Sequence, residues 1–459
     1  MTARRNTGTA VLFLAGIFGA VIFLFFGALS QSGGFLEAAR PSRSDHQLFA
    51  PPHKTVRVGQ PVKNPGLISL SKVSMEKVDA LIQGSEPALN AALDRDYSFI
   101  NLYGASQKLL GRQVVEDVEP KYTVVRLADG SLTFANPDAQ QVDMTVRAQE
   151  MVEFAQRLEE EYETPLLYIQ APSKLAMASL PDGINDYADA EADQFLSILE
   201  EHEVDTLDLR PAFRQAAAEG RALDELFFRT DHHWTAAGAF LGFQTLADKL
   251  RDDYDYTIYP EITDPGHYNK YTFHDIFLGS QGKRVGTAYA GLDDLEVWSP
   301  NFESDFTYTV PMSGIERRGP FAMSLLFPEM LATDESLYES NPYTVYSGGD
   351  FLLARTVNEV SPYPWGRRVL VLRDSYGCAF TPFLGIISGE VITIDPRLFN
   401  GDQEEMLSYV EWLEPDLIFV LNTTSSLRVD ELFPYLPTAR ADALETKRLE
   451  REQGTSHVW

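Results

Sequence analysis

Two short segments carry the residue types that serine-based nucleophilic chemistry requires. Residues 373–377 (RDSYG) place Ser375 directly after an apolar run, and residues 230–235 (TDHHWT) contain an Asp-x-His pair. A serine hydroxyl becomes a competent nucleophile when an imidazole takes its proton, and a carboxylate fixes the tautomer of that imidazole. We therefore predict Ser375 as the nucleophile, His233 as the general base and Asp231 as the residue that orients His233.

The neighbours of these residues are predicted to contact the substrate or an oxyanion. A serine at a strand-to-helix turn lies at the carboxyl edge of a sheet, and the N–H groups of the following helix turn can stabilise an oxyanion. In residues 279–284, glycines allow close backbone approach, and Gln and Arg supply donors. The predicted contacts are His232, Gln281, Arg284, Asp374, Tyr376 and Gly377, with Gln170 and Lys174 at the same rim.

Each segment also has a simpler interpretation. Asp374 and Ser375 are ordinary helix-capping residues, and residues 279–284 read as a glycine turn with solvated charges. The 230–235 segment reads as a capped helix start with a buried indole. Asp231 and the two histidines are good zinc ligands, but adjacent side chains in an extended loop point opposite ways and no second His/Cys cluster lies nearby. We predict no metal and no cofactor.

The elements that must position these residues follow an α/β pattern. Apolar runs of strand length alternate with amphipathic segments of helix length, as in βαβ units, and this predicts a parallel sheet flanked by helices. Residues 122–135 predict a hairpin, and residues from about 255 to 365 predict an irregular or β-rich insertion near the site. The expected strands are 166–170, 204–209, 368–372, 391–394 and 417–421, and the expected helices are 144–162, 188–201, the segment after Thr235, 378–387 and 406–413.

Composition sets further limits. The chain has 459 residues, 44% of them hydrophobic, which is enough for a large core. Lys and Arg number 38 against 67 Asp and Glu, so the formal charge of −29 would repel a polyanion and excludes a nucleic-acid partner. Cys378 is the single cysteine, which rules out an intrachain disulfide and a CxxC zinc site.

The N-terminus predicts attachment to a membrane. Residues 10–29 carry no charge and have about the length that a helix needs to cross ~30 Å of hydrocarbon. Arg4 and Arg5 favour a cytoplasmic N-terminus, so the rest of the chain is expected outside the cytoplasm, at the cell surface or in a periplasm. A cleaved signal peptide is the alternative, because Ala28-Leu29-Ser30 resembles a cleavage site.

The expected organisation has four parts. Residues 1–30 form the cytoplasmic N-terminus and transmembrane anchor, and residues 31–72, rich in Pro, Gly and polar residues, form a stalk. The α/β domain occupies 73–438 and includes the insertion. A charged tail, 439–459, completes the chain.

Four motifs carry a more specific resemblance: TDHHW at 230–234, LGSQGKRVGTAYAGLDDL at 278–295, VLVLRDSYGCAFTPFL at 369–384 and VITIDPRLF at 391–399. Together they resemble the DHHW protein family, relatives of the SGNH-hydrolase superfamily and of the alginate O-acetyltransferases, over about residues 90–425. The resemblance implies an SGNH-like sheet and a triad in which the Asp-x-His pair precedes the serine. It differs at Arg373, where the superfamily usually has glycine, so the nucleophile turn is expected to be more crowded.

The resemblance implies acyl transfer to a cell-surface or secreted polysaccharide. Ser375 would attack an acetyl ester and pass the acetyl group to a sugar hydroxyl or to water, and aromatic residues in 255–365 would stack on sugar rings. A membrane-bound O-acyltransferase is the implied partner that delivers the acetyl group. The alternative is a non-catalytic carbohydrate-binding or exopolysaccharide-assembly protein that retains the fold.

Overall fold

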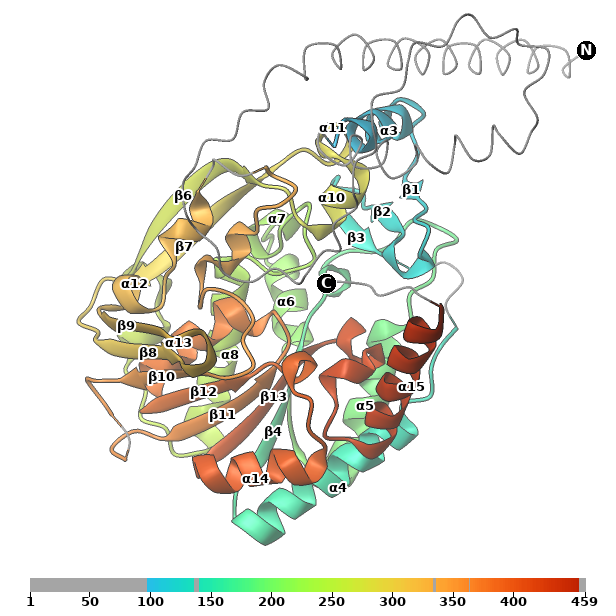
Figure 1. The fold of residues 1–459 in the computed structure, drawn as a ribbon. Coiled ribbons are helices and arrows are strands. Elements are labelled where there is room, and N and C mark those ends of the chain that lie inside the picture. The colour runs from blue at the N-terminus through green and yellow to red at the C-terminus, as the bar shows by residue number, and fades with distance from the viewer. Residues whose placement is uncertain (1–96, 136–139, 333–335, 363, 454–459) are drawn as a thin grey trace, which may run out of the picture. The chain divides into compact units, whose positions relative to one another are not determined.

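The computed structural model describes residues 97–135, 140–332, 336–362 and 364–453 (Figure 1). All of them lie within one compact unit, Glu76–Trp459. The predicted anchor and stalk lie outside these residues, so the predicted domain boundaries there stay predictions. Within the described residues, no helix combines the length and the apolar character that crossing a bilayer requires.

An eight-stranded mixed sheet forms the centre of the domain. Its first five strands are parallel, and its last three run antiparallel to their neighbours. The predicted parallel sheet is therefore confirmed for its central part. In spatial order the strands are β5 (Asp205–Asp208), β4 (Leu166–Ala171), β13 (Leu417–Thr423), β11 (Arg368–Arg373), β12 (Glu390–Ile394), β10 (Ala354–Asn358), β8 (Phe306–Val310) and β9 (Ile315–Gly319).

Both faces of the parallel strands β4, β13, β11 and β12 are buried, which explains their apolar runs, whereas the edge strand β5 is half-buried. In β11, Val369 and Val371 enter one core while Leu370 and Leu372 enter the other, because successive side chains point to opposite faces. Figure 1 shows the two helical layers. One core is covered by α6 (Arg210–Ala218), α8 (Ala236–Asp253) and α13 (Gly377–Ile387), and the other by α4 (Thr145–Tyr162), α5 (Ala188–Glu201), α14 (Gln403–Leu413) and α15 (Pro437–Gln453).

The insertion corrects the expectation of a wholly parallel sheet. Strands β8, β9 and β10 come from this insertion and extend the central sheet beyond β12, instead of forming a separate unit. Each of β8 and β10 alternates buried and half-buried residues, and Gly314, at a φ of 64°, lies in the short turn between β8 and β9. Short connections join antiparallel strands, whereas parallel strands need a long crossover.

Smaller elements surround the edge that carries the site. A three-stranded sheet contains the predicted hairpin, which is confirmed by the antiparallel pairing of its second and third strands. The insertion also contributes a two-stranded ribbon. These elements are α3 (Ser98–Leu109), β1 (Val114–Val115), β2 (Val124–Arg126), β3 (Leu132–Phe134), α7 (Leu223–Leu226), α9 (Pro260–Thr263), β6 (Tyr268–Phe277), α10 (Ser280–Val285), α11 (Thr287–Ala290), β7 (Asp293–Pro300) and α12 (Phe321–Ser324).

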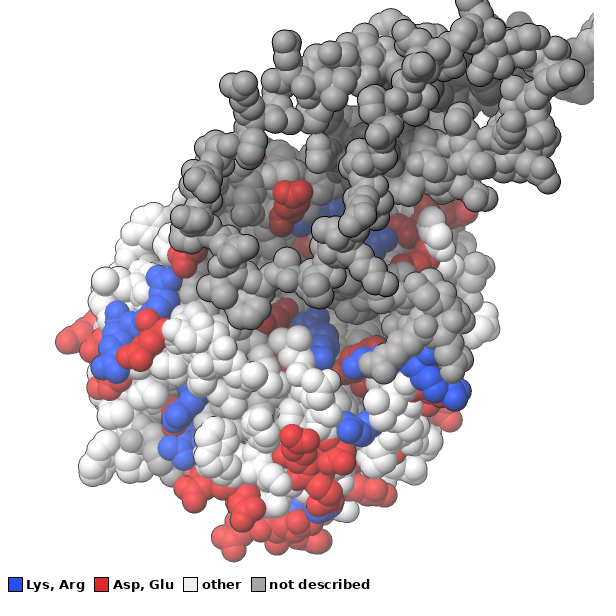
Figure 2. Space-filling model, viewed as in Figure 1, with Lys and Arg blue, Asp and Glu red and all other residues white. Residues whose placement is uncertain are grey.

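The negative charge is spread unevenly over the visible face. Figure 2 shows Asp and Glu side chains gathered over α14 and α4, with Lys and Arg in smaller separate groups. A surface of this kind repels polyanions at low ionic strength.

The core position of β11 predicts a large effect of truncation. Leu370 is fully buried, so we expect Leu370→Ala to reduce the free energy of unfolding by about 2–5 kcal/mol, through lost burial and a residual cavity. Val360, which is 59% exposed, provides the control. Val360→Ala is expected to change the free energy of unfolding by less than about 0.5 kcal/mol. Urea denaturation measures both. Equal effects would contradict the placement of β11 at the centre.

Candidate active site

The nucleophile turn lies at the carboxyl edge of the central sheet. β11 ends at Arg373, and α13 begins at Gly377, so Ser375 occupies the turn between them. The neighbouring strands β13 and β12 run parallel to β11 and end at the same edge. Open α/β sheets bind their ligands there. The Ser375 side chain is half-buried and remains accessible from this edge.

The structure brings the three predicted catalytic side chains into one hydrogen-bonded chain. Nε2 of His233 lies 2.7 Å from Oγ of Ser375, and Nδ1 of His233 lies 2.5 Å from Oδ1 of Asp231. An ionised carboxylate only accepts hydrogen bonds, so Nδ1 carries the proton and Nε2 of the neutral ring is the acceptor. This tautomer is the one that can remove a proton from Ser375. The catalytic roles of Asp231, His233 and Ser375 remain predictions.

Asp231 is held as an anion. Its Oδ1 also accepts the backbone N–H of His233 at 3.0 Å, and its Oδ2 accepts the backbone N–H of Ser280 at 2.6 Å. Burial favours the protonated form, but the imidazoles of His233 and His232 hold the pKa of Asp231 well below its ordinary value. Gly279 permits this approach, because a Cβ there would lie 2.1 Å from Cβ of Asp231.

Asp374 has a structural position rather than the predicted substrate contact. Its Oδ1 accepts the backbone N–H of Tyr376 at 2.9 Å, and its Oδ2 accepts the N–H of Thr423 at 3.0 Å and the hydroxyl of Ser426 at 2.7 Å. The carboxylate is therefore fully engaged in joining the nucleophile turn to the loop after β13. It fixes the height of Ser375 above the sheet.

The predicted oxyanion donors of the first helix turn are also occupied. The N–H of Tyr376 donates to Asp374, and the N–H of Gly377 donates to the carbonyl of Asp374 at 3.1 Å. Both donors therefore bond within the turn, although the sequence predicted that they would bind an oxyanion. Within the described part of the chain, the N–H of Ser375 has no hydrogen-bond acceptor. This N–H is the donor available for an oxyanion.

Tyr376 joins the TDHHW segment to the turn that carries Ser375. Its ring is buried, and its hydroxyl donates to the carbonyl of His232. In return, Nε1 of Trp234 donates to the carbonyl of Tyr376 at 3.1 Å. The indole thus has a direct role in holding the TDHHW segment against the nucleophile turn. His232 remains half-buried beside the triad, with Nδ1 2.8 Å from Oγ of Ser280.

The remaining predicted contacts point away from the triad. Oε1 of Gln281 accepts from the buried Nζ of Lys174 at 3.0 Å, and Lys174 also donates to the carbonyls of Leu132 and Arg229. Arg284 donates to Asp117 at 3.1 Å and lies over the ring of Tyr122. Gln170 is buried and donates to the carbonyls of Ala171 and Asn422. These side chains link segments around the site.

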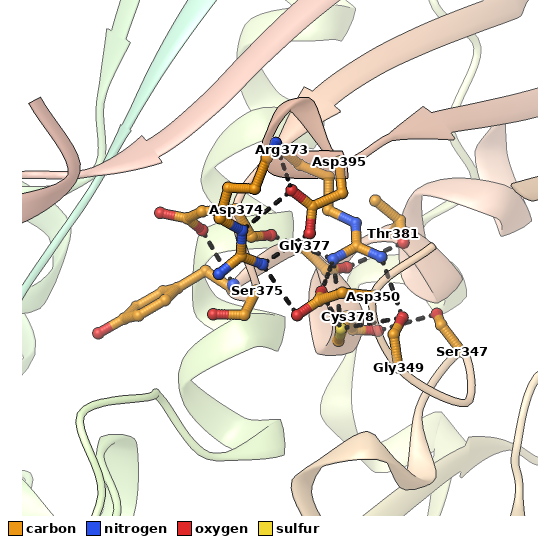
Figure 3. Close-up of polar contacts among 12 residues, drawn as sticks. Ser347, Gly349, Asp350, Arg373, Asp374, Ser375, Gly377, Cys378, Thr381 and Asp395 are labelled. Atoms are coloured by element: carbon orange, nitrogen blue, oxygen red, sulfur yellow. Dashed lines mark hydrogen bonds and ion pairs between the residues drawn. The ribbon is translucent and has the colours of Figure 1, made fainter. Parts of the chain in front are cut away.

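Arg373 turns into the protein and does not crowd Ser375. Its guanidinium donates to Asp350, to the carbonyl of Gly349 and to Sγ of Cys378, and Asp350 also accepts from Arg397 at 2.9 Å. Figure 3 shows Arg373, Asp350 and Asp395 gathered beside the turn that carries Ser375. Against the effect of burial, Arg373 and Arg397 lower the pKa of Asp350.

The space that Arg373 needs comes from Gly377. A Cβ at position 377 would lie 2.1 Å from Cδ of Arg373, so only glycine fits beside this arginine. The Arg373 side chain therefore occupies the space beside Gly377, at the start of α13, and the expected crowding of Ser375 is not found.

Asp231, His232 and His233 also form a grouping with metal-like spacing. Their potential ligand atoms lie within 4.8 Å of one another. The nitrogens of His233 face Asp231 and Ser375, however, and an ion bound there would replace the contact to Ser375. The donor set therefore fits proton transfer better than zinc coordination.

Two residues that support the site escaped the sequence interpretation. The backbone N–H of Ser280 donates to Asp231, and Asp293 accepts the N–H groups of Arg229 and Thr230 at 2.8 Å each. Both belong to the LGSQGKRVGTAYAGLDDL motif, which was the signal that could have identified them. The motif does not reveal their hydrogen-bond partners. They fix the loop that leads to His233.

Part of the chain matches the model of a known sequence family. Residues 131–262 match the family described as SGNH hydrolase-like domain, acetyltransferase AlgX. The matched segment contains the Asp-x-His pair and ends before Ser375. No curated protein sequence matches the chain.

Solved structures with TM-scores above 0.5 share the fold. Bacillus cereus PatB1 with a sulfonyl adduct is 21% identical, with a TM-score of 0.54, and covers 70% of this chain and 99% of its own. A DHHW family protein from Eubacterium siraeum is 17% identical, with a TM-score of 0.53, and covers 70% and 97%. The O-acetyltransferase domain of Pseudomonas putida AlgJ is 15% identical, covers 69% and 94%, and reaches a TM-score of 0.41. The predicted SGNH-like, DHHW-type resemblance is confirmed.

Lys174 gives the stability of the domain a distinctive pH dependence. Burial lowers the pKa of Lys174 from its ordinary 10.5 to about 8, so between these values the unfolded chain binds more protons than the folded one. As the pH rises from about 8 to 10.5, Lys174 therefore increases the free energy of unfolding by up to about 1.4 kcal/mol per pH unit. Below about pH 8 the folded protein bears the cost of burying the charged ammonium group. We expect Lys174→Met to remove this gain in urea denaturation from pH 8 to 10.5. Identical slopes in both proteins would contradict the assignment.

Chelation tests the zinc alternative. We expect exhaustive EDTA treatment to change the melting temperature by less than about 2 °C and any cleavage of 4-nitrophenyl acetate by less than about twofold, because the ring nitrogens of His233 already face Asp231 and Ser375. Release of acid from 4-nitrophenyl acetate and a melting curve provide the measurements. A loss that added Zn²⁺ restored would establish a metal site.

Proposed function

We propose that this chain is a serine-dependent acyl-transfer protein, an O-acetyltransferase or acetylesterase acting on a cell-surface or secreted polysaccharide. The observation that carries the proposal is the chain of contacts from Asp231 through His233 to Ser375. The acetyl group as cargo is supported by the family match, whose description names an acetyltransferase. The polysaccharide acceptor rests on the sequence resemblance to the alginate O-acetyltransferases.

The first half of the reaction forms an acetyl-enzyme. Oγ of Ser375 attacks the carbonyl carbon of an acetyl ester, and Nε2 of His233 takes the hydroxyl proton. The carbonyl oxygen becomes an oxyanion that accepts the free N–H of Ser375, a donor whose effect is large in a site that excludes water. The tetrahedral intermediate then collapses. The ester C–O bond breaks, and the leaving alcohol takes the proton from His233.

The second half returns the enzyme to its starting state. A sugar hydroxyl or a water molecule attacks the acetyl carbon while His233 takes its proton. The acyl bond to Ser375 breaks, and the serine oxygen regains the proton. The ionised Asp231 stabilises the imidazolium that exists between the two proton transfers. Transfer exceeds hydrolysis when a bound sugar excludes water.

The proposed location is outside the cytoplasm. The uncharged segment 10–29 would anchor the domain or direct its export, and a membrane-bound O-acyltransferase would supply acetyl groups across the membrane. Both points rest on the sequence and the resemblance.

Activity measurements test the triad. We expect Ser375→Ala to lower the rate of 4-nitrophenyl acetate cleavage at least about 10³-fold, and Asp231→Asn to lower it by a similar order, because the first removes the nucleophile and the second favours the wrong tautomer.

Ser388 offers a matched control for the serine substitution. Ser388 is buried and lies at the C-cap position at the opposite end of α13, so Ser388→Ala should retain the wild-type rate within about twofold. Equal rates in the wild type and in Ser375→Ala, whether both are active or both inert, would refute the proposed function.

A further inference from the structure

Tyr343 contacts both halves of the triad from the inserted segment. It lies in a short 3₁₀ helix, Pro342–Val345, and its side chain is buried. Its ring stacks on the imidazole of His233 with centroids 3.9 Å apart and planes at 17°. Its hydroxyl donates to the carbonyls of Ser375 at 3.1 Å and Tyr376 at 3.2 Å. One side chain therefore touches the general base and the backbone of the nucleophile.

The surroundings keep this tyrosine rigid and protonated. The ring of Phe228 meets it edge-on, with centroids 6.2 Å apart and planes at 89°. The segment is pinned further along, where the N–H of Phe327 donates to the carbonyl of Val345 at 2.7 Å. Burial raises the pKa of Tyr343 well above its ordinary value, so the hydroxyl is protonated and remains a donor at neutral pH.

The hydrogen bonds of His233 leave one motion free that Tyr343 restricts. Asp231 and Ser375 meet the ring in its plane and at its two nitrogens. Such bonds fix the direction of Nε2 but allow the imidazole to pivot about the line that joins its two partners. The ring of Tyr343, stacked nearly parallel on the imidazole, blocks this pivot, and the more tilted ring of His232, with its centroid 3.8 Å away, also contacts the imidazole.

We propose that Tyr343 is a positioning residue for acyl transfer, which holds the imidazole of His233 and the backbone of Ser375 at a fixed separation. The role rests on the proposed function. Position 343 lies outside the segment that matches the sequence family, so the match assigns it no role. A misplacement of about 1 Å in a catalytic group can cost about 10²-fold in rate, which makes such a restraint valuable.

Paired substitutions separate the ring from the hydroxyl. Tyr343→Phe keeps the stack and loses two hydrogen bonds, so kcat for 4-nitrophenyl acetate should fall by less than about tenfold. Tyr343→Leu loses both contacts, and kcat should fall about 10²-fold while KM stays within about twofold, because the acetyl ester itself is not contacted. The partial rescue by phenylalanine distinguishes positioning from a general loss of folding.

Tyr308 provides the matched control. It is equally buried in β8, and its hydroxyl also donates to a backbone carbonyl, that of Ser347, at 2.7 Å. Tyr308→Phe and Tyr308→Leu should lower the melting temperature as the Tyr343 variants do, yet keep kcat within about twofold of wild type. If Tyr343→Leu retained wild-type kcat, or if Tyr308→Leu lost as much, the positioning role would be refuted.

A second readout does not need catalysis. The Nδ1 proton of His233 in its short bond to Asp231 gives a low-field NMR resonance, which a freely pivoting ring loses through exchange with water. We expect this resonance in the wild type, Tyr343→Phe and Tyr308→Leu, and its broadening in Tyr343→Leu. If wild type and Ser375→Ala were equally inert, the proposed function would fail, and this resonance would still decide whether Tyr343 orders His233. An unchanged resonance in Tyr343→Leu would refute the positioning role.

Discussion

The contact between Nε2 of His233 and Oγ of Ser375 is the interaction on which the site depends, and it joins positions 142 residues apart in the chain. A hydrogen bond is lost within a few tenths of an ångström, so the two segments need a closer restraint than the overall packing provides. Reciprocal backbone contacts supply it. Tyr376 binds the carbonyl of His232, and Trp234 binds the carbonyl of Tyr376. The aromatic neighbours of His233 and Ser375 thus set the distance between these two side chains.

Charge is arranged around this contact so that the two sides have different tasks. On the histidine side, Asp231 stays ionised because it faces imidazole and N–H donors. On the serine side, Asp374 has all its bonding directed to the backbone and the loop after β13. The adjacent Arg373 pairs with Asp350 and leaves the mouth of the site. Two carboxylates that look similar in sequence therefore serve orientation in one case and architecture in the other.

Much of the central sheet and the grouping of Asp231, His233 and Ser375 could be predicted from the sequence, because they depend on local patterns. Apolar runs such as RVLVL define a buried strand, and Asp-x-His and Ser are few and distinctive. The directions of single side chains could not be predicted. Gln281 and Arg284 face Lys174 and Asp117, partners more than 100 residues away, and no local pattern encodes that pairing. The N–H groups of Tyr376 and Gly377 were misjudged because their use depends on how tightly the turn closes.

The way the insertion joins the sheet affects how the domain tolerates rearrangement. β10 lies against β12 as an antiparallel neighbour, so the inserted strands cap what would otherwise be an open sheet border next to the site. A chain that lost residues 306–358 would present the N–H and C=O groups of β12 to solvent, and such unpaired borders recruit strands from other molecules. The insertion instead moves the border of the sheet to β9, where the charged residues Glu316, Arg317 and Arg318 disfavour such pairing. Loss of residues 306–358 would also remove Tyr343 and with it the contacts to His233 and to the backbone of Ser375.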